Sequence, residues 1–577
     1  MSESTRPLPS LIPLSHGGWE VKSLMSSTDF MIRGLGLLPP NSVIPIIVVP
    51  GIMGTNLRAR RKPRLGRKRD ERNGVVKPGE PVWRPPNGKQ QGLRDTYRWD
   101  RRSPKDRQLL FDPATLEVDS DGPIVLPVPE DGYVLSDDDV RLRGWGEVHA
   151  DSYSGLLYAL QTRLNQTFGF NDISKTRFVK QHWKKLMALD PQMKGMNIEP
   201  LTESHLERHA QHYFPAYAVG YNWLEDCASS SLRLEQRILE IIESWKNAKR
   251  TCSKVILVTH SMGGLVARAC AKRIPDKIAG VIHGVMPALG APAAYRRLAC
   301  GTEAFSPSNG AMEDLNGVAI AKILGDTTEK TTPVLATAPG ALELLPNHLY
   351  PQPWLHIRVM MSAGLQPATH GGRGDTIRHR EVPVDYLHMP SAKVSNPYDL
   401  YRDMKSWYRM INPLLADPAG IYRRQAGGVE NAIKSALAAA EKFHRSLGEY
   451  YHPNTYAFYG IDPGKLAYGQ LRWSAPHRTG SALALTPANL AAARAIGSVP
   501  GGMRRVTVEE KSELQFAPEP QESAGDGTVP HQSGAGPTGN IKQIFATRGY
   551  DHQGAYNDEQ MLMLTLRLIV RIVQELS

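Results

Sequence analysis

The sequence predicts an α/β fold in which a mostly parallel sheet forms the centre of the molecule. Residues 43–49 are a near-continuous β-branched run, which is typical of a strand buried on both faces. A second such run, residues 255–259, leads into a tight turn and a helix from Leu265, and residues 281–285 are a third expected strand. A strand, a helix and a strand of these lengths form a right-handed parallel unit.

The other elements are expected around this unit. Residues 153–166 and 232–245 have the apolar spacing of amphipathic helices. After residue 300 the pattern changes to proline-bounded segments and helices, which predicts a largely helical cap. The sequence is thus divided into an N-terminal extension (1–40), a first part of the core (41–300), a cap (301–450) and a second part of the core (451–577). A terminal helix is expected to begin at Asn557.

The positive charge is concentrated in one segment. Lys and Arg exceed Asp and Glu by 12 over the 577 residues, and residues 58–107 alone contain 18 basic and 6 acidic residues. The rest of the chain is therefore neutral overall. This Pro- and Gly-rich segment follows the first strand and is interpreted as a basic insertion. A solvated mobile loop is the simplest interpretation, attraction to an anionic membrane surface is the functional alternative, and no nucleic-acid-binding signature accompanies it.

Ser261 is the candidate nucleophile. It lies in His260-Ser261-Met262-Gly263-Gly264, between a buried strand and a helix. A nucleophile elbow needs this context, with small residues beside the serine, and it predicts an α/β-hydrolase fold. Thr259 stands where the motif usually has its first glycine, and its branched side chain is expected to crowd the turn.

Two later residues complete a candidate triad with this serine. A serine hydroxyl needs a histidine to take its proton, and the histidine needs a carboxylate to hold its tautomer. Asp526, flanked by glycines, is the candidate acid, and His552, on the loop before the last helix, is the candidate base. His531 is a rival base and Asp551 is a weaker rival acid.

Backbone groups are the candidate oxyanion donors. The amide of Met262 would supply one donor, and the loop after the first strand would supply the other through Ile52 or Met53. The side chain of Met53 is also a candidate for substrate binding. This chemistry needs no metal or cofactor, and Asp137, Asp138 and Asp139 lack the spacing of a calcium loop.

Several segments together resemble known families. Residues 49–55, 221–223, 259–264, 342–346 and 525–530 resemble lecithin:cholesterol acyltransferase and the GPI-inositol deacylases. Two further segments, Gly284 to Tyr295 and Asp551 to Tyr556, are similar to bacterial type VI secretion lipase effectors of the fourth family.

The resemblance implies an α/β-hydrolase that cleaves acyl esters of lipids, most simply a phospholipase that works at a membrane surface. In the bacterial group it further implies transfer by the type VI machinery into a recipient's periplasm and a cognate immunity protein. The opening residues lack the pattern of a signal peptide, so synthesis in the cytoplasm without Sec export is expected.

Other interpretations remain open. A neutral-lipid lipase or esterase, an acyltransferase and a catalytically idle binding protein all fit the same residues. The cap is expected to gate the site, because lipid substrates need a dry cleft. Within it, residues 398–415 would either face lipid as a lid or pack into the core.

Overall fold

The computed structural model describes most of the chain. It describes residues 12–13, 19–20, 40–61, 76–127, 135–171, 176–190, 192, 197–309, 311–365, 379–391, 394–476, 484–499, 502–510 and 512–576.

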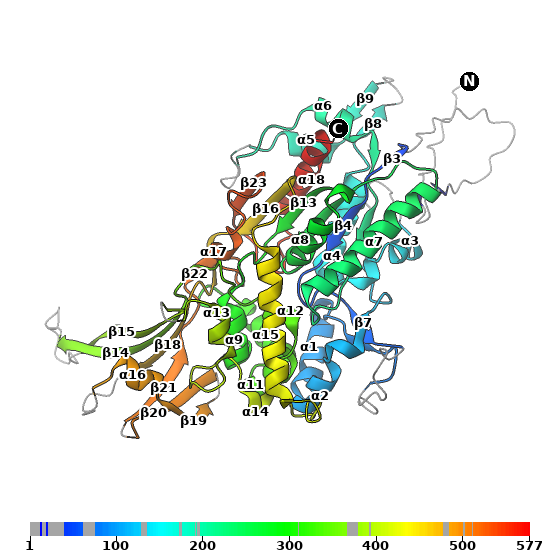
Figure 1. Ribbon diagram of the computed structural model, residues 1–577. Coiled ribbons are helices and arrows are strands. Elements are labelled where there is room, and N and C mark those ends of the chain that lie inside the picture. The colour runs from blue at the N-terminus through cyan, green and yellow to red at the C-terminus, as the bar shows by residue number, and fades with distance from the viewer. Residues whose placement is uncertain are drawn as a thin grey trace, which may run out of the picture.

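The central sheet is parallel throughout the described strands, which have the order β11-β4-β12-β13-β16-β23 (Figure 1). Its members are β4 (Ile46–Val49), β11 (Ala216–Ala218), β12 (Val255–His260), β13 (Ile278–Gly284), β16 (Thr455–Gly460) and β23 (Gln543–Thr547). Every residue of β4, β11, β12 and β13 is buried. The predicted α/β-hydrolase core is confirmed.

Helices cover both faces of this sheet. Alternate side chains of β4 enter opposite apolar layers, with Ile46 and Val48 in one and Ile47 and Val49 in the other. The first layer contains α4 (Ala150–Arg163) and α18 (Glu559–Gln574), and the second contains α7 (Cys227–Asn247) and α8 (Gly263–Arg273).

The last helix begins one residue later than expected. Asp558, and not Asn557, is the N-cap of α18, because its carboxylate accepts the backbone N–H groups of Gln560 and Met561.

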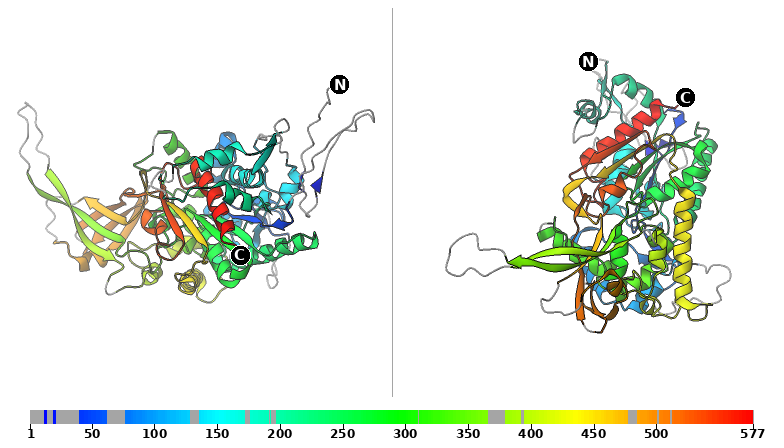
Figure 2. Two further views of the ribbon diagram at one scale, coloured as in Figure 1. Left: turned by 90° about the horizontal axis from the view of Figure 1, so that it is seen from above. Right: turned by 60° about the vertical axis from the view of Figure 1, so that its left-hand side comes forward.

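A second, mixed sheet forms a separate lobe beside the core (Figure 1, Figure 2). Its order is β15-β14-β18-β21-β20-β19, and only β14 and β18 are parallel. The strands are β14 (Leu355–Leu365), β15 (His379–Met389), β18 (Leu471–Pro476), β19 (Arg494–Val499), β20 (Met503–Val508) and β21 (Ser512–Pro518).

This lobe corrects two expectations about the cap. The cap contains α10 (Ala311–Leu324), α11 (Thr328–Leu335), α12 (Pro339–Leu342), α13 (Pro397–Arg402), α14 (Pro413–Ala416) and α15 (Gly428–Leu447). It also supplies the long hairpin β14–β15, so it is only partly helical. Since β18 to β21 join that hairpin, the lobe extends past residue 450 into the segment expected to belong to the core.

The stretch from residue 398 to 415 packs mainly inward. Tyr401, Trp407, Tyr408 and Met410 are buried in a third apolar cluster, together with strands of the second sheet. Of the five large apolar side chains considered for a lid, only Leu414, which is 89% exposed, faces solvent. The lid interpretation is therefore wrong for four of these five side chains in this conformation.

The described part of the basic insertion is more structured than a solvated loop, while residues 62–75 lie outside the described residues. It contains β6 (Pro81–Trp83), α1 (Gly88–Asp100) and most of α2 (Pro104–Leu110). Helix α1 packs beside α10, and α2 beside α11. The guanidinium of Arg107 is buried and donates to the backbone carbonyls of Ile323, Lys322 and Trp99. This described part of the insertion is thus attached to the cap.

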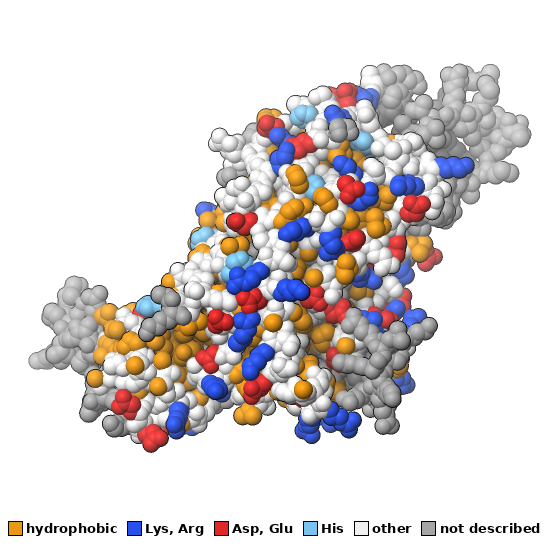
Figure 3. Space-filling view, in the orientation of Figure 1, with side chains coloured by type: hydrophobic (Ala, Val, Ile, Leu, Met, Phe, Trp, Pro, Cys, Tyr) orange, Lys and Arg blue, Asp and Glu red, His pale blue; other side chains and the backbone are white. Residues whose placement is uncertain are grey.

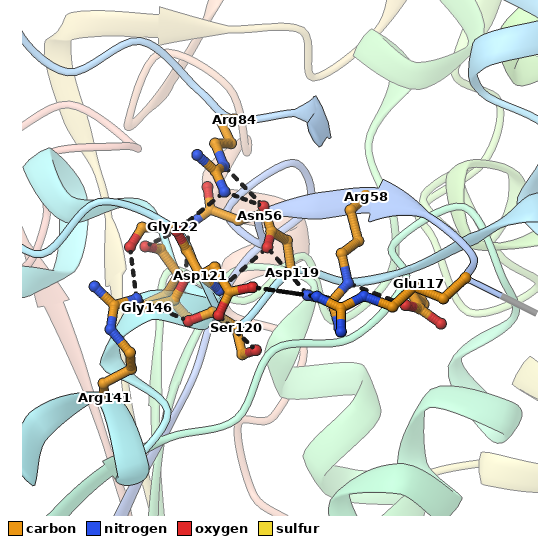
Figure 4. Close-up of polar contacts among 12 residues, drawn as sticks. Asn56, Arg58, Arg84, Glu117, Asp119, Ser120, Asp121, Gly122, Arg141 and Gly146 are labelled. Carbon is orange, nitrogen blue, oxygen red and sulfur yellow. Dashed lines mark hydrogen bonds and ion pairs between the residues drawn. The ribbon is translucent and has the colours of Figure 1, made fainter. Parts of the chain in front are cut away.

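Part of its charge is neutralised by acids that follow it (Figure 4). Asp119, only 1% exposed, pairs with Arg84 at 2.7 Å and lies 3.8 Å from Arg58. Arg58 also bonds Glu117 and Asp121, each at 3.0 Å. Counting charges within residues 58–107 alone therefore overstates the exposed positive charge of this region.

The outer surface mixes charges of both signs. On the face in Figure 3, Lys and Arg alternate with Asp and Glu over α15, while apolar side chains gather over the second sheet. Among the residues described, no helix combines the length and the apolar character needed to cross a bilayer.

Candidate active site

Ser261 occupies a sharp turn between β12 and α8. Its φ of 52° lies in the left-handed region, where a non-glycine residue is strained, and its N–H donates to the carbonyl of Gly284 at 2.9 Å. The following glycines are required by close packing. A Cβ on Gly263 would lie 2.4 Å from the carbonyl oxygen of Pro50, and one on Gly264 would lie 2.4 Å from the sulfur of Met286. The turn therefore has the geometry of a nucleophile elbow.

Thr259 is accommodated without displacing the serine. Its hydroxyl lies 2.8 Å from Nδ1 of His283, its register partner on β13, and both side chains are buried. Burial lowers the pKa of His283 to about 3, so this imidazole is neutral. The threonine that was expected to crowd the elbow is held instead by a hydrogen bond to the neighbouring strand.

The three predicted triad residues lie in one hydrogen-bonded line. The hydroxyl of Ser261 is 2.8 Å from Nε2 of His552, and Nδ1 of His552 is 2.8 Å from Oδ2 of Asp526. The other carboxylate oxygen of Asp526 accepts the N–H groups of Thr528 and Val529 at 3.0 and 2.7 Å. These bonds fix the carboxylate, which holds the ring so that Nε2 can accept the serine proton.

Neither rival occupies this line. Nδ1 of His531 lies near Ser523 and the carbonyl of Ala524, at 3.3 and 3.1 Å. Asp551 is exposed, and its carboxylate accepts the N–H of Gly554 at 2.6 Å. The arrangement is therefore built with Asp526 and His552.

The predicted oxyanion loop lies next to the elbow. Gly54 donates its N–H to the carbonyl of Gly51 at 3.1 Å, and Met53, with a φ of 63°, occupies the left-handed position of this turn. The N–H groups of Ile52 and Met262 have no hydrogen-bond partner among the described residues. Ile52 and Met53 are half-buried against the second apolar layer, and the carbonyl of Met53 accepts Nε1–H of Trp83 at 2.7 Å.

The triad is largely buried, with the side chain of His552 the most exposed of the three at 14%. Ser261 is 3% exposed and Asp526 is 1% exposed. Helix α12 of the cap lies beside the elbow, because a Cβ on Gly340 would be 2.9 Å from the terminal methyl of Met262. A cavity of about 790 Å³ lies elsewhere, between α3 (Asp137–Leu142) and α7, and none of the triad residues lines it.

A buried acid joins the cap to α7 near this site. The carboxyl of Glu343, within the segment 342–346, accepts the N–H of Cys227 at 2.8 Å, and its other oxygen is buried without a partner among the described residues. Burial raises the pKa of Glu343 to about 8. Burial therefore favours the neutral acid at this position, which the sequence alone did not indicate.

One cluster has the composition of a metal site, outside the triad. His356 and Asp385 lie with His388 on the β14–β15 hairpin, and the two Nδ1 atoms are 3.0 Å apart. Asp385 already accepts two bonds from the guanidinium of Arg358, at 2.8 and 3.3 Å. That positive charge opposes a bound cation, and the triad chemistry does not use the cluster.

Fold and site together define the class of this chain as an α/β hydrolase with a serine at the nucleophile elbow. Residues 222–315 match the family model of the PGAP1-like alpha/beta domain. Among solved structures, the chain is similar to one described as the crystal structure of the Tle4-Tli4 complex, with 26% sequence identity, coverage of 92% of this chain and 99% of that chain, and a TM-score of 0.70. No match was found among curated proteins. The expected resemblance to the GPI-inositol deacylases and to type VI lipase effectors is confirmed.

Proposed function

We propose that this chain is a serine hydrolase of lipid acyl esters, most specifically a phospholipase. The single observation that supports it best is the line from Ser261 through His552 to Asp526, which starts at a strained elbow. Because Ser261 and His552 are 2.8 Å apart, the geometry does not favour the idle binding protein, in which Thr259 would have distorted the turn.

In the proposed reaction, His552 takes the proton of Ser261 while Oγ attacks the ester carbonyl carbon. The N–H groups of Met262 and Ile52 stabilise the resulting oxyanion. The bond to the alcohol oxygen then breaks, and His552 returns the proton to that leaving oxygen. Water repeats the sequence on the acyl-enzyme and releases the fatty acid.

The substrate and biology are proposed from the relatives. The likeness to Tle4, solved with Tli4, supports a role as a type VI effector that degrades phospholipids in the recipient periplasm and has its own immunity protein. Synthesis in the cytoplasm and transfer by the type VI machinery are part of this proposal. Met53, beside the oxyanion turn, is proposed to contact the acyl chain.

We further propose that α1 attracts the protein to an anionic membrane. Its outer face exposes Leu93 (74%) and Tyr97 (64%), and Arg94 and Arg98 beside them are also exposed. Apolar side chains next to cations suit the boundary between lipid headgroups and acyl chains. Helix α1 is attached near the site, since Trp99 stacks on Phe111 and both contact Trp83, which bonds Met53.

The test is mass-spectrometric detection of fatty acid and lysolipid released from phosphatidylglycerol and phosphatidylethanolamine vesicles, with wild type beside Ser261→Ala. Release by wild type alone is expected. Covalent labelling by a fluorophosphonate separates the remaining alternatives: a labelled protein without phospholipid release points to neutral lipids, and an unlabelled wild type points to the binding protein.

A further inference from the structure

Four groups behind the triad form a continuous chain of hydrogen bonds. The N–H of Gly51 lies 2.9 Å from the hydroxyl of Tyr153, and that hydroxyl lies 2.8 Å from Nδ1 of His260. Nε2 of His260 lies 2.8 Å from the backbone carbonyl of His552. The chain thus runs from the oxyanion turn, through α4 and the end of β12, to the loop that carries the candidate base.

The direction of every bond follows from the end groups. A backbone carbonyl only accepts, so Nε2 of His260 must carry the proton that it donates to His552. A backbone N–H only donates, so the oxygen of Tyr153 accepts from Gly51. The hydroxyl proton of Tyr153 then has one acceptor, Nδ1 of His260. This pattern satisfies every group only when His260 is neutral, with its proton on Nε2.

The surroundings keep His260 in that state. Tyr153 is 2% and His260 is 5% exposed. Burial, reinforced by the nearby His552, lowers the pKa of His260 to about 3. The two imidazole rings are 5.3 Å apart between centroids, so a charged His260 would oppose the imidazolium that forms on His552 during catalysis. A neutral ring can support the base without this repulsion.

The packing leaves little freedom at this junction. A Cβ on Gly51 would lie 2.8 Å from Nδ1 of His260 and 2.9 Å from Cβ of Ser261. The oxyanion turn and the nucleophile are therefore in direct contact with the hydrogen-bonded chain through Tyr153 and His260, which we call the relay. A shift of Tyr153 or His260 would displace the donor loop and the base relative to the serine.

We propose that Tyr153 and His260 are positioning residues, which hold the oxyanion turn and the backbone of His552 in register with Ser261. This inference rests on the proposed hydrolase function and deepens it. Neither side chain touches the reacting atoms: both act through Gly51 and His552.

The first test is Tyr153→Phe, which removes one hydroxyl and interrupts the relay at its centre. We expect kcat on a monomeric ester to fall about 10- to 100-fold, since small misplacements of reacting groups cost this much. KM should stay within about twofold, because the loss concerns the transition state. The rate of fluorophosphonate labelling should fall in parallel.

Tyr401→Phe is the matched control. This buried tyrosine also loses a hydroxyl, whose bond goes to the carbonyl of Pro346 in the cap. We expect a comparable decrease in Tm with kcat within about twofold of wild type. If both variants lose kcat in proportion to their Tm, the role of Tyr153 is only structural and the inference is wrong.

A second pair of variants tests the link to His552. His260→Gln places an amide nitrogen near the position of Nε2, where it can still donate to the carbonyl of His552. His260→Asn is shorter and reaches only toward Tyr153. We expect the glutamine variant to retain more kcat than the asparagine variant, at similar KM.

These outcomes distinguish a failure of the proposed hydrolase function from a failure of the positioning role. A wild-type protein that neither cleaves esters nor labels removes the hydrolase function, and the relay with it. An active wild type with full activity in Tyr153→Phe, or with equal activity in the two His260 variants, overturns the relay while the hydrolase function stands.

Discussion

Replacing Asp526 by asparagine should disable the base while preserving the fold. The amide oxygen can keep the bonds that Oδ1 accepts from Thr528 and Val529, at 3.0 and 2.7 Å. The amide nitrogen then faces Nδ1 of His552, where the carboxylate now accepts a hydrogen bond from Nδ1–H at 2.8 Å. The ring must adopt the other tautomer, with its proton on Nε2 pointing at Ser261. It can then no longer accept the serine proton.

The expected loss is large because the wrong tautomer removes general-base catalysis. The equivalent change in a serine protease lowers kcat about 10⁴-fold, which corresponds to about 5 kcal/mol of transition-state stabilisation. Tm should change little, since the amide fills the same space. Initial rates on a monomeric ester and thermal melting measure both quantities.

The control for this substitution is the rival acid next to the base. Asp551→Asn can keep the surface bond to the N–H of Gly554, so its kcat should remain within about twofold of wild type. A kcat for Asp526→Asn within about tenfold of wild type would refute the assigned tautomer and the role of Asp526. A large loss in Asp551→Asn instead would move the acid to that residue.

Further predictions concern the elbow, the cap and the membrane. Gly51→Ala should lower kcat at least about 100-fold, since its Cβ would lie 2.8 Å from Nδ1 of His260; rates on a monomeric ester check this. Burial raises the pKa of Glu343 to about 8, so the native state binds its proton more tightly than the unfolded state does. The free energy of unfolding should therefore fall as the pH rises from the unfolded pKa to pH 8, by up to about 1.4 kcal/mol per pH unit. Melting of Glu343→Gln should lack this fall; an equal fall would contradict the assignment. Arg98→Glu should weaken sedimentation with phosphatidylglycerol vesicles about fivefold or more, while Lys434→Glu on the exposed face of α15 should not; equal effects would remove α1 as the docking face.

The sequence predicts the parts of this molecule that depend on local pattern. Residues 255–259 are apolar and β-branched and are followed by small residues, so the strand and the elbow are recognisable without knowledge of the fold. Antiparallel strands are expected after residue 459, but the strand order of the second sheet is not predictable, because β14 and β18 pair across more than a hundred residues. Their pairing depends on contacts that no local window contains.

The residues of the site also divide into those that a local pattern predicts and those that depend on long-range contacts. Asp526 and His552 are predictable because the fold fixes the order of the triad and each residue lies in a distinctive segment. Tyr153 is not, because within its segment it is one apolar position of an amphipathic helix. Its hydroxyl acquires a hydrogen-bond partner only when α4 packs against the end of β12, which brings it to His260, 107 positions later. Arg107 is a comparable case. Its charge predicts exposure to solvent, but its buried guanidinium donates to three backbone carbonyls.

The apolar layer beside the triad connects the cap to the proposed oxyanion donors. Ile52 and Met262, whose N–H groups are the proposed oxyanion donors, share the second apolar layer with Ala338 and Ala341 of the cap. If the cap gates the site, as its sequence predicts, substrate entry would open some of this packing and remove support from the same two residues. The relay through Tyr153 and His260 does not involve the cap: it ties Gly51 and His552 to α4 and β12, in the core. If the cap moves during catalysis, this hydrogen-bonded chain would keep the oxyanion turn and the base attached to the core.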